Sequence, residues 1–97
     1  IGLAGDFGQP FFDEAWAKLL ELDRLYPSYN VGQIRYSPDK AEPKWRDDQA
    51  LYERLARRGG FDPTLSFPGF VIWDKERVMW LAPVAPMEIL LATINNW

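Results

Sequence analysis

The 97-residue chain contains no cysteine and no histidine. Without cysteine it has no disulfide, no thiolate nucleophile and no cysteine ligands for zinc. Without histidine it has no Ser-His or Cys-His pair to activate a nucleophile. We therefore predict no catalytic residues, no cofactor, no metal site and no disulfide exchange, and we do not expect an enzyme. Cysteine usage normally indicates whether a protein works in an oxidising or a reducing compartment, and a chain without cysteine gives no such indication.

Basic clusters and long apolar runs are also lacking. The 11 Lys and Arg and the 14 Asp and Glu give a net charge of -3, and the basic residues are scattered. The chain therefore lacks the basic face that phosphate binding needs, and no nucleic-acid partner is expected. No apolar run approaches the ~20 residues of a membrane span, which predicts a soluble chain without a membrane partner. With no signal peptide in the sequence, the expected compartment is cytoplasmic, or periplasmic or secreted if Ile1 follows a removed signal.

Aromatic residues, in contrast, are abundant. The chain has five Trp, four Tyr and six Phe, and 47% of its residues are apolar. Aromatic side chains bury a large area each. A chain of this length buries about 60–65% of its unfolded surface, enough for one core. The composition predicts a single globular domain over residues 1–97.

The most informative stretch runs from Ser66 to residue 82. Phe67-Pro68 precedes an apolar strand over residues 69–73, a polar turn follows at 74–77, and a second apolar strand covers 78–82. Side chains alternate between the two faces of a strand, and both sets are apolar in the first of these strands. We therefore expect an antiparallel hairpin whose first strand is covered on both faces.

The rest of the chain alternates between the two kinds of element. Apolar residues at helical spacing predict helices at 11–25, at 44–58 and from Pro86 onward, and shorter apolar patterns predict strands at 1–5 and 29–37. The polar residues 37–43, with two prolines, are predicted to form a loop. The expected class is α/β with a mixed sheet, in the order β-α-β-α-β-β-α. We expect a parallel first strand pair and a three-layer sandwich with one helix on one face and two on the other.

Two local matches make this order resemble the thioredoxin-like superfamily. Phe67-Pro68, ahead of the strand at 69–73, resembles the point where that superfamily has a cis proline. Phe7-Gly8-Gln9-Pro10-Phe11, between the first strand and the first helix, resembles the aromatic-Cys-Gly-Pro-Cys motif, with Gly8 and Phe11 in the cysteine positions. The resemblance implies a thioredoxin-like fold, a cis Phe67–Pro68 bond and a site where the two loops meet. It does not imply disulfide exchange, because that reaction needs the missing thiolates.

The resulting hypothesis is a non-catalytic thioredoxin-like domain that acts as a protein- or peptide-interaction or scaffolding module. An extended peptide of another protein would pair with the backbone beside the cis proline. Self-association into a homo-oligomer, or a place in a larger assembly, is compatible with this role. The candidate binding residues come from the two loops: Phe7, Gly8, Gln9, Pro10, Phe11, Phe67, Pro68 and Gly69.

Two alternatives stay open for the same loops. The resemblance extends to glutathione-transferase-like proteins, so a second hypothesis is a glutathione-type small-ligand-binding or transferase-like domain that uses the cis-proline loop. A third is a purely structural role, in which Phe7 and Phe11 belong to the core and Pro68 fixes a turn.

Other clusters have simpler explanations. Asp13 and Glu14 suit the first turn of a helix through the helix dipole, and only Asp6 is expected to be partly buried. No calcium-loop pattern is present, so these carboxylates predict no metal site. Core packing is expected for most tryptophans of the second half of the chain, with Trp97 the most exposed: Trp73, Trp80 and Trp97.

Overall fold

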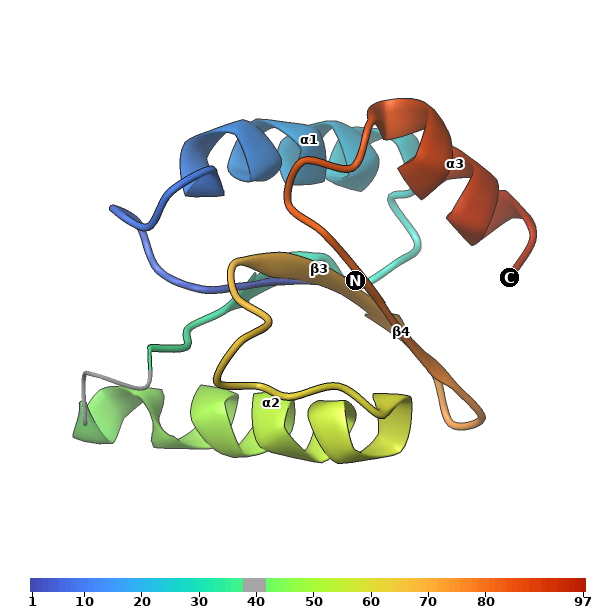
Figure 1. The fold of residues 1–97 in the computed structure, drawn as a ribbon. Helices are drawn as coiled ribbons and strands as arrows, with labels where there is room; N and C mark the ends of the chain where they lie inside the picture. The colour runs from blue at the N-terminus through green and yellow to red at the C-terminus, as the bar shows by residue number, and fades with distance from the viewer. Residues whose placement is uncertain (38–41) are drawn as a thin grey trace.

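The computed structural model describes residues 1–37 and 42–97 of the chain. Its elements follow in the order β1 (Gly2–Ala4), α1 (Phe12–Leu25), β2 (Gly32–Ile34), the 3₁₀ turn η1 (Pro43–Trp45), α2 (Arg46–Gly59), β3 (Gly69–Trp73), β4 (Val78–Leu81) and α3 (Met87–Asn95). The four strands form one mixed sheet in the spatial order β2-β1-β3-β4. Helices α1 and α3 lie on one side of this sheet and α2 lies on the other (Figure 1). The α/β class and the predicted order of helices and strands are confirmed.

The strand pairings follow the expected directions. β1 and β2 run parallel, with Gly2 opposite Gly32, and β3 runs antiparallel to both β1 and β4. Phe70 and Ile72 of β3 pack into the cluster beneath α1 and α3, whereas Val71 packs into the cluster above α2. The prediction that this strand is covered on both faces is therefore confirmed.

Helix α1 is held by an apolar stripe at helical spacing. Its buried residues recur three or four positions apart and face the sheet: Phe12, Ala15, Leu19 and Leu22. Each fully buried side chain of Leu or Phe size contributes about 1.5–3 kcal/mol relative to an exposed one. Burial of this stripe is therefore what holds α1 against the sheet.

Helix α2 buries Tyr52, Leu55 and Ala56 and stops where the sequence predicts. Gly60 has a φ of 75°, which a residue without Cβ adopts at little cost. In this conformation its N–H bonds the carbonyl of Ala56 at 2.8 Å. The glycine thus ends the helix by satisfying one of its last carbonyl groups.

The second strand is shorter than predicted, covering Gly32–Ile34 instead of 29–37. At its start, the N–H of Tyr29 closes a turn onto the carbonyl of Tyr26 at 3.0 Å. Beyond its end, the N–H of Arg35 bonds the carboxylate of Asp48 at 3.1 Å. The neighbouring strand β1 ends at Ala4, so no ladder partner remains there. Pairing with β1 sets the length of β2, and an apolar pattern alone does not report it.

Two further boundaries differ from the prediction. β1 covers three residues instead of five, because Gly5 has a φ of 133° and leaves the strand direction. The loop predicted over 37–43 falls mostly on residues 38–41, which lie outside the described residues, and Pro43 already begins η1.

A compact hydrogen-bonded junction joins α2, β4 and the segment that leads into β3. The carbonyl of Ser66 accepts hydrogen bonds from the hydroxyl of Tyr52 and from Nε1 of Trp80, the latter at 3.0 Å. Tyr52 is fully buried, and burial raises the pKa of its hydroxyl above the ordinary value. The indole of Trp80 also covers Gly69, where an added Cβ would lie 2.2 Å from Nε1. The backbone just before β3 is therefore fixed by side chains from two other elements.

We expect the free energy of unfolding to fall as pH rises above about 10, the ordinary pKa of tyrosine. Because burial raises the pKa of Tyr52, the unfolded chain loses this proton at a lower pH than the folded chain, and alkaline solution favours unfolding. Urea unfolding measured on both sides of this pH tests the expectation. Tyr52→Phe should flatten the decline and cost about 1 kcal/mol at neutral pH for the lost hydrogen bond. An equally steep decline in both proteins would assign the pH dependence to other groups.

Gly69→Ala should lower the free energy of unfolding by about 1–3 kcal/mol, because the new methyl group collides with the indole of Trp80. The near-ultraviolet circular dichroism of tryptophan should change with it. Gly32→Ala is the matched control, since no heavy atom lies within 4 Å of a Cβ at that strand position. Similar destabilisation by both substitutions would argue against the Trp80 contact as the cause.

Candidate functional site

The sheet brings the two predicted loops together at one end of the molecule. Residues 7–11 follow β1 and residues 67–68 lead into β3, and these strands are antiparallel neighbours with Ala4 opposite Gly69. The segment that leaves β1 therefore meets the segment that enters β3. A Cβ on Gly5 would lie only 3.0 Å from the Cβ of Pro68. The loop after β1 is the dark blue segment that projects beyond the sheet in Figure 1.

Gln9 fixes the first loop from within. Its Oε1 accepts a hydrogen bond from the N–H of Asp6 at 2.9 Å, and its Nε2 donates to the carbonyl of Tyr36 at 3.4 Å. The ring of Tyr36 in turn meets the ring of Phe67 edge-on, with centroids 5.5 Å apart. Gln9 is therefore a positioning residue that ties the first loop, through Tyr36, to the second.

Phe7 lies across the start of α1. Its ring contacts Phe12 and Trp16, with centroid separations of 4.7 and 5.3 Å, yet 53% of the residue stays exposed. Gly8 follows with a φ of 98° and open space around it, and Pro10 is exposed. The loop thus packs a phenyl ring against the helix while about half of the residue stays exposed to solvent.

Phe11 has an unusual conformation for its residue type. It is the N-cap of α1 with a φ of 69°, and it is the only described residue other than glycine with a positive φ. Its side chain makes no capping hydrogen bond, and 57% of the residue is exposed. The alternative in which Phe7 and Phe11 belong to the core is wrong, because more than half of each residue is exposed.

The second loop contributes backbone groups. The peptide bond between Phe67 and Pro68 is cis. Phe67 is partly buried, while Pro68 and Gly69 are buried. Among the described residues, no hydrogen bond uses the backbone N–H or carbonyl of Phe67. In contrast, the carbonyl of the preceding residue, Ser66, already accepts two hydrogen bonds, from Tyr52 and from Trp80.

The acidic residues near the first loop behave as ordinary helix-start residues. Asp13 and Glu14 are exposed in the first turn of α1, and Asp6 is partly buried, as predicted. Within residues 1–37 and 42–97, no three acidic side chains gather closely enough to hold a metal ion. The arrangement offers apolar contact and backbone hydrogen bonding, and a chain without cysteine or histidine adds no thiolate or imidazole to it.

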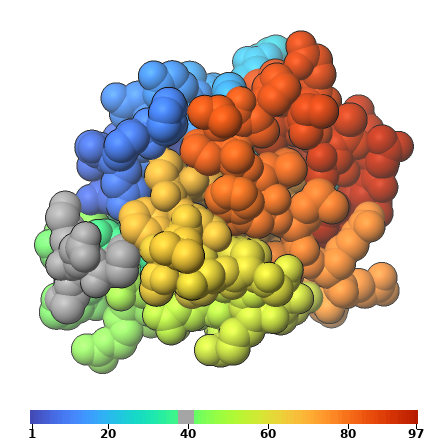
Figure 2. Space-filling model, viewed as in Figure 1, coloured from blue at the N-terminus to red at the C-terminus, as the bar shows by residue number. Residues whose placement is uncertain are grey.

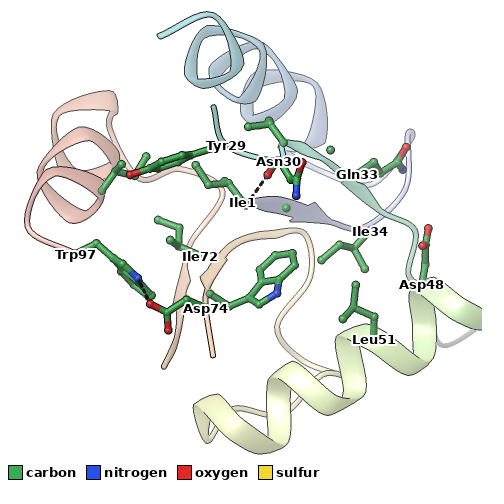
Figure 3. Close-up of a pocket in the computed structure, with 15 residues that line it drawn as sticks. Ile1, Tyr29, Asn30, Gln33, Ile34, Asp48, Leu51, Ile72, Asp74 and Trp97 are labelled. Atoms are coloured by element: carbon green, nitrogen blue, oxygen red, sulfur yellow. Dashed lines mark hydrogen bonds between the residues drawn. The ribbon is translucent and has the colours of Figure 1, made fainter. Parts of the chain in front are cut away.

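A pocket that the sequence did not predict lies at the opposite end of the sheet (Figure 3). Its volume is about 580 Å³, and it lies beside the start of β1 and the free edge of β2. Ile34 and Leu51 line it on the α2 side of the sheet, whereas Ile72 and Trp97 line it on the α3 side. No local motif marks it, because its walls come from elements distant in sequence.

Two carboxylates at this pocket already have partners. Asp48 binds Nε of Arg35 at 3.0 Å. The backbone N–H groups of Arg77 and Glu76, together with the indole of Trp97, bond Asp74 and hold its pKa below the usual range. The pocket therefore combines apolar walls with carboxylates that are engaged within the fold.

The three tryptophans expected mainly in the core are all partly buried beside the two clusters. Trp97 is tied down by its bond to Asp74, at 2.7 Å, and by the guanidinium of Arg77, 4.2 Å above its ring. All three fall in the same partly buried range, so the expectation that Trp97 is the most exposed of them stays a prediction. None of the helices in the described part of the chain has the length and apolar character needed to cross a bilayer.

Comparison of the chain with protein-family models, with curated proteins and with solved structures gives no match.

Proposed function

We propose that this chain is a non-catalytic thioredoxin-like domain that binds an extended peptide of another protein where residues 7–11 meet residues 67–69. The strand order β2-β1-β3-β4, with its parallel first pair and the cis bond before β3, supports the proposed fold. Gly8 and Phe11 stand where the resemblance places reactive cysteines, so binding without exchange is the proposed activity.

The conformation of Phe11 carries this proposal. A left-handed backbone costs an L-residue other than glycine roughly 1–2 kcal/mol. Burial of the side chain does not offset this cost, because 57% of Phe11 is exposed. Backbone strain that is not offset by burial of the same residue is found most often at ligand contacts and other functional positions. The outward ring of Phe11 therefore supports a binding role for this end of the molecule.

Backbone groups beside the ring support strand pairing as the mode of binding. The N–H and carbonyl of Phe67 have no partner among the described residues. An extended peptide bonds such groups through its own backbone and places alternate side chains into neighbouring apolar contacts. Phe7 and Phe11 would supply those contacts, since more than half of each residue is exposed.

Peptides selected from a random display library on the folded domain should bind at this end of the sheet. With one such peptide, we expect the largest backbone amide chemical shift changes at residues 5–11 and 66–69. Glutathione, titrated in parallel, tests the small-ligand alternative at the same loops. A library without binders, or shift changes centred on the pocket beside β2, would contradict the proposal.

Phe11→Gly should weaken binding of a selected peptide at least about tenfold, which corresponds to 1.4 kcal/mol. The same substitution should leave the free energy of unfolding unchanged or raise it by up to about 1 kcal/mol, because glycine adopts a positive φ without strain. Leu20→Ala is the matched control, since it removes another exposed apolar side chain, on α1. Equal binding by Phe11→Gly and the parent chain would exclude Phe11 from the site.

A further inference from the structure

The last twenty residues of the chain are almost free of charge. Residues 78–97, which contain β4 and α3, hold one charged side chain, that of Glu88, whereas charged residues make up 26% of the whole chain. Segments with so few charges are usually buried. Of these twenty residues, however, only Leu90 and Ile94 are buried. The fold therefore leaves most residues of a segment with a single charge at least partly exposed.

β4 exposes an open edge of the sheet. It pairs with β3 alone, and the N–H of Asp74 bonds the carbonyl of Arg77 at 3.0 Å. Hydrogen-bonded and non-bonded residue pairs alternate along an antiparallel pair of strands. In this register the backbone N–H and carbonyl groups of Met79 and Leu81 point toward β3. The backbone groups of Val78 and Trp80 therefore point away from the sheet.

This edge lacks the usual protection. Natural sheet edges carry a charge, a proline or a bulge, or are covered by another element. β4 consists of Val-Met-Trp-Leu, and among the described residues no hydrogen bond uses the outward backbone groups of Val78 and Trp80. At the other edge, the N–H of Arg35 just beyond β2 is capped by Asp48. The two edges thus differ: β2 has three residues and is followed by a capped N–H group, whereas β4 has four residues and offers the longer open edge for a further strand.

Helix α3 borders the same edge. A groove of about 250 Å³ between them is lined by Arg77 and Met79 on the β4 side and by Ala92, Thr93, Asn96 and Trp97 in α3 and just beyond it. Ile89 is 47% exposed and shares this helix face, because residues three, four and seven positions apart lie on one side of a helix. The orange and red atoms of β4 and α3 lie side by side on the face shown in Figure 2. We name the edge of β4 and this face of α3 the β4–α3 surface.

We propose that the β4–α3 surface is the interface between two copies of this chain, formed by antiparallel pairing of two β4 strands across a two-fold axis. Val78 of each copy would bond Trp80 of the other, and the two Met79 side chains would meet at the axis. The α3 helices would then flank the joined sheets. This inference does not depend on the peptide site proposed at residues 7–11 and 67–69.

A second copy suits this surface better than an unrelated protein. An antiparallel edge is complementary to itself under two-fold symmetry, which is the commonest symmetry of oligomers. The chain as a whole carries a net charge of -3, whereas the charged residue that lines the groove, Arg77, already bonds the carbonyl of Trp97 and lies over the ring of that residue. Depletion of charged residues is also the compositional mark of an interface core.

Sedimentation equilibrium over a hundredfold range of chain concentration tests the proposal. We expect the mass to rise from the 11.3 kDa of one chain toward twice that value. Met79→Lys should raise the dissociation constant at least tenfold, because it brings two ammonium groups together at the axis. The backbone amides of Val78 and Trp80 should exchange hydrogen more slowly as the concentration of the parent chain rises.

Leu20→Lys is the matched control for the charge introduced by Met79→Lys. Leu20 is 54% exposed. Lys18 marks the side of α1 that faces α3, because it bonds the carbonyl of Ala85 just ahead of that helix, and Leu20 lies about 200° around α1 from Lys18. This variant should associate like the parent chain, and circular dichroism should show both variants folded. A mass of 11.3 kDa at every concentration, or a dimer that persists in folded Met79→Lys, would overturn the proposal.

Discussion

The antiparallel pairing of β1 with β3 is the contact on which the rest of the structure depends. It places two short apolar strands in the middle of the sheet, where β3 sends Phe70 and Ile72 to one face and Val71 to the other. Both faces must then be covered, and α1 with α3 on one side and α2 on the other provide that cover. The same pairing sets Ala4 opposite Gly69, so the loops that leave β1 and enter β3 are neighbours.

The two ends of the sheet have different chemistry as a result. One end holds the cis Phe67–Pro68 bond, the Gln9 bridge and two outward phenylalanines, all built around a backbone that Tyr52 and Trp80 fix through Ser66. The other end holds a pocket with apolar walls whose carboxylates are already bonded within the fold. The left-handed backbone of Phe11 and the unused peptide groups of Phe67 lie at the first end, which is why we place the proposed function there.

Local patterns predicted the helices and the hairpin well, because these depend on neighbours in the sequence. The stripe from Phe12 to Leu22 and the stop at Gly60 are examples. The same approach failed for the strand expected at 29–37, because β2 extends only as far as β1 accompanies it. For the candidate site, the resemblance to the thioredoxin-like superfamily implied that the two loops would meet. It did not predict the left-handed backbone of Phe11, the role of Gln9 or the pocket beside β2, each of which depends on contacts between distant segments.

The sequence by itself determined which chemistry is absent and which segments are apolar: a chain without cysteine or histidine has no thiolate or imidazole, and residues 78–97 are nearly free of charge in any conformation. Only the tertiary structure decided where those apolar residues lie. Register and strand order bury Leu90 and Ile94 but leave Met79 and Ile89 at the surface beside an open edge. Exposure is a property of packing between elements, and hydropathy along a chain does not contain it.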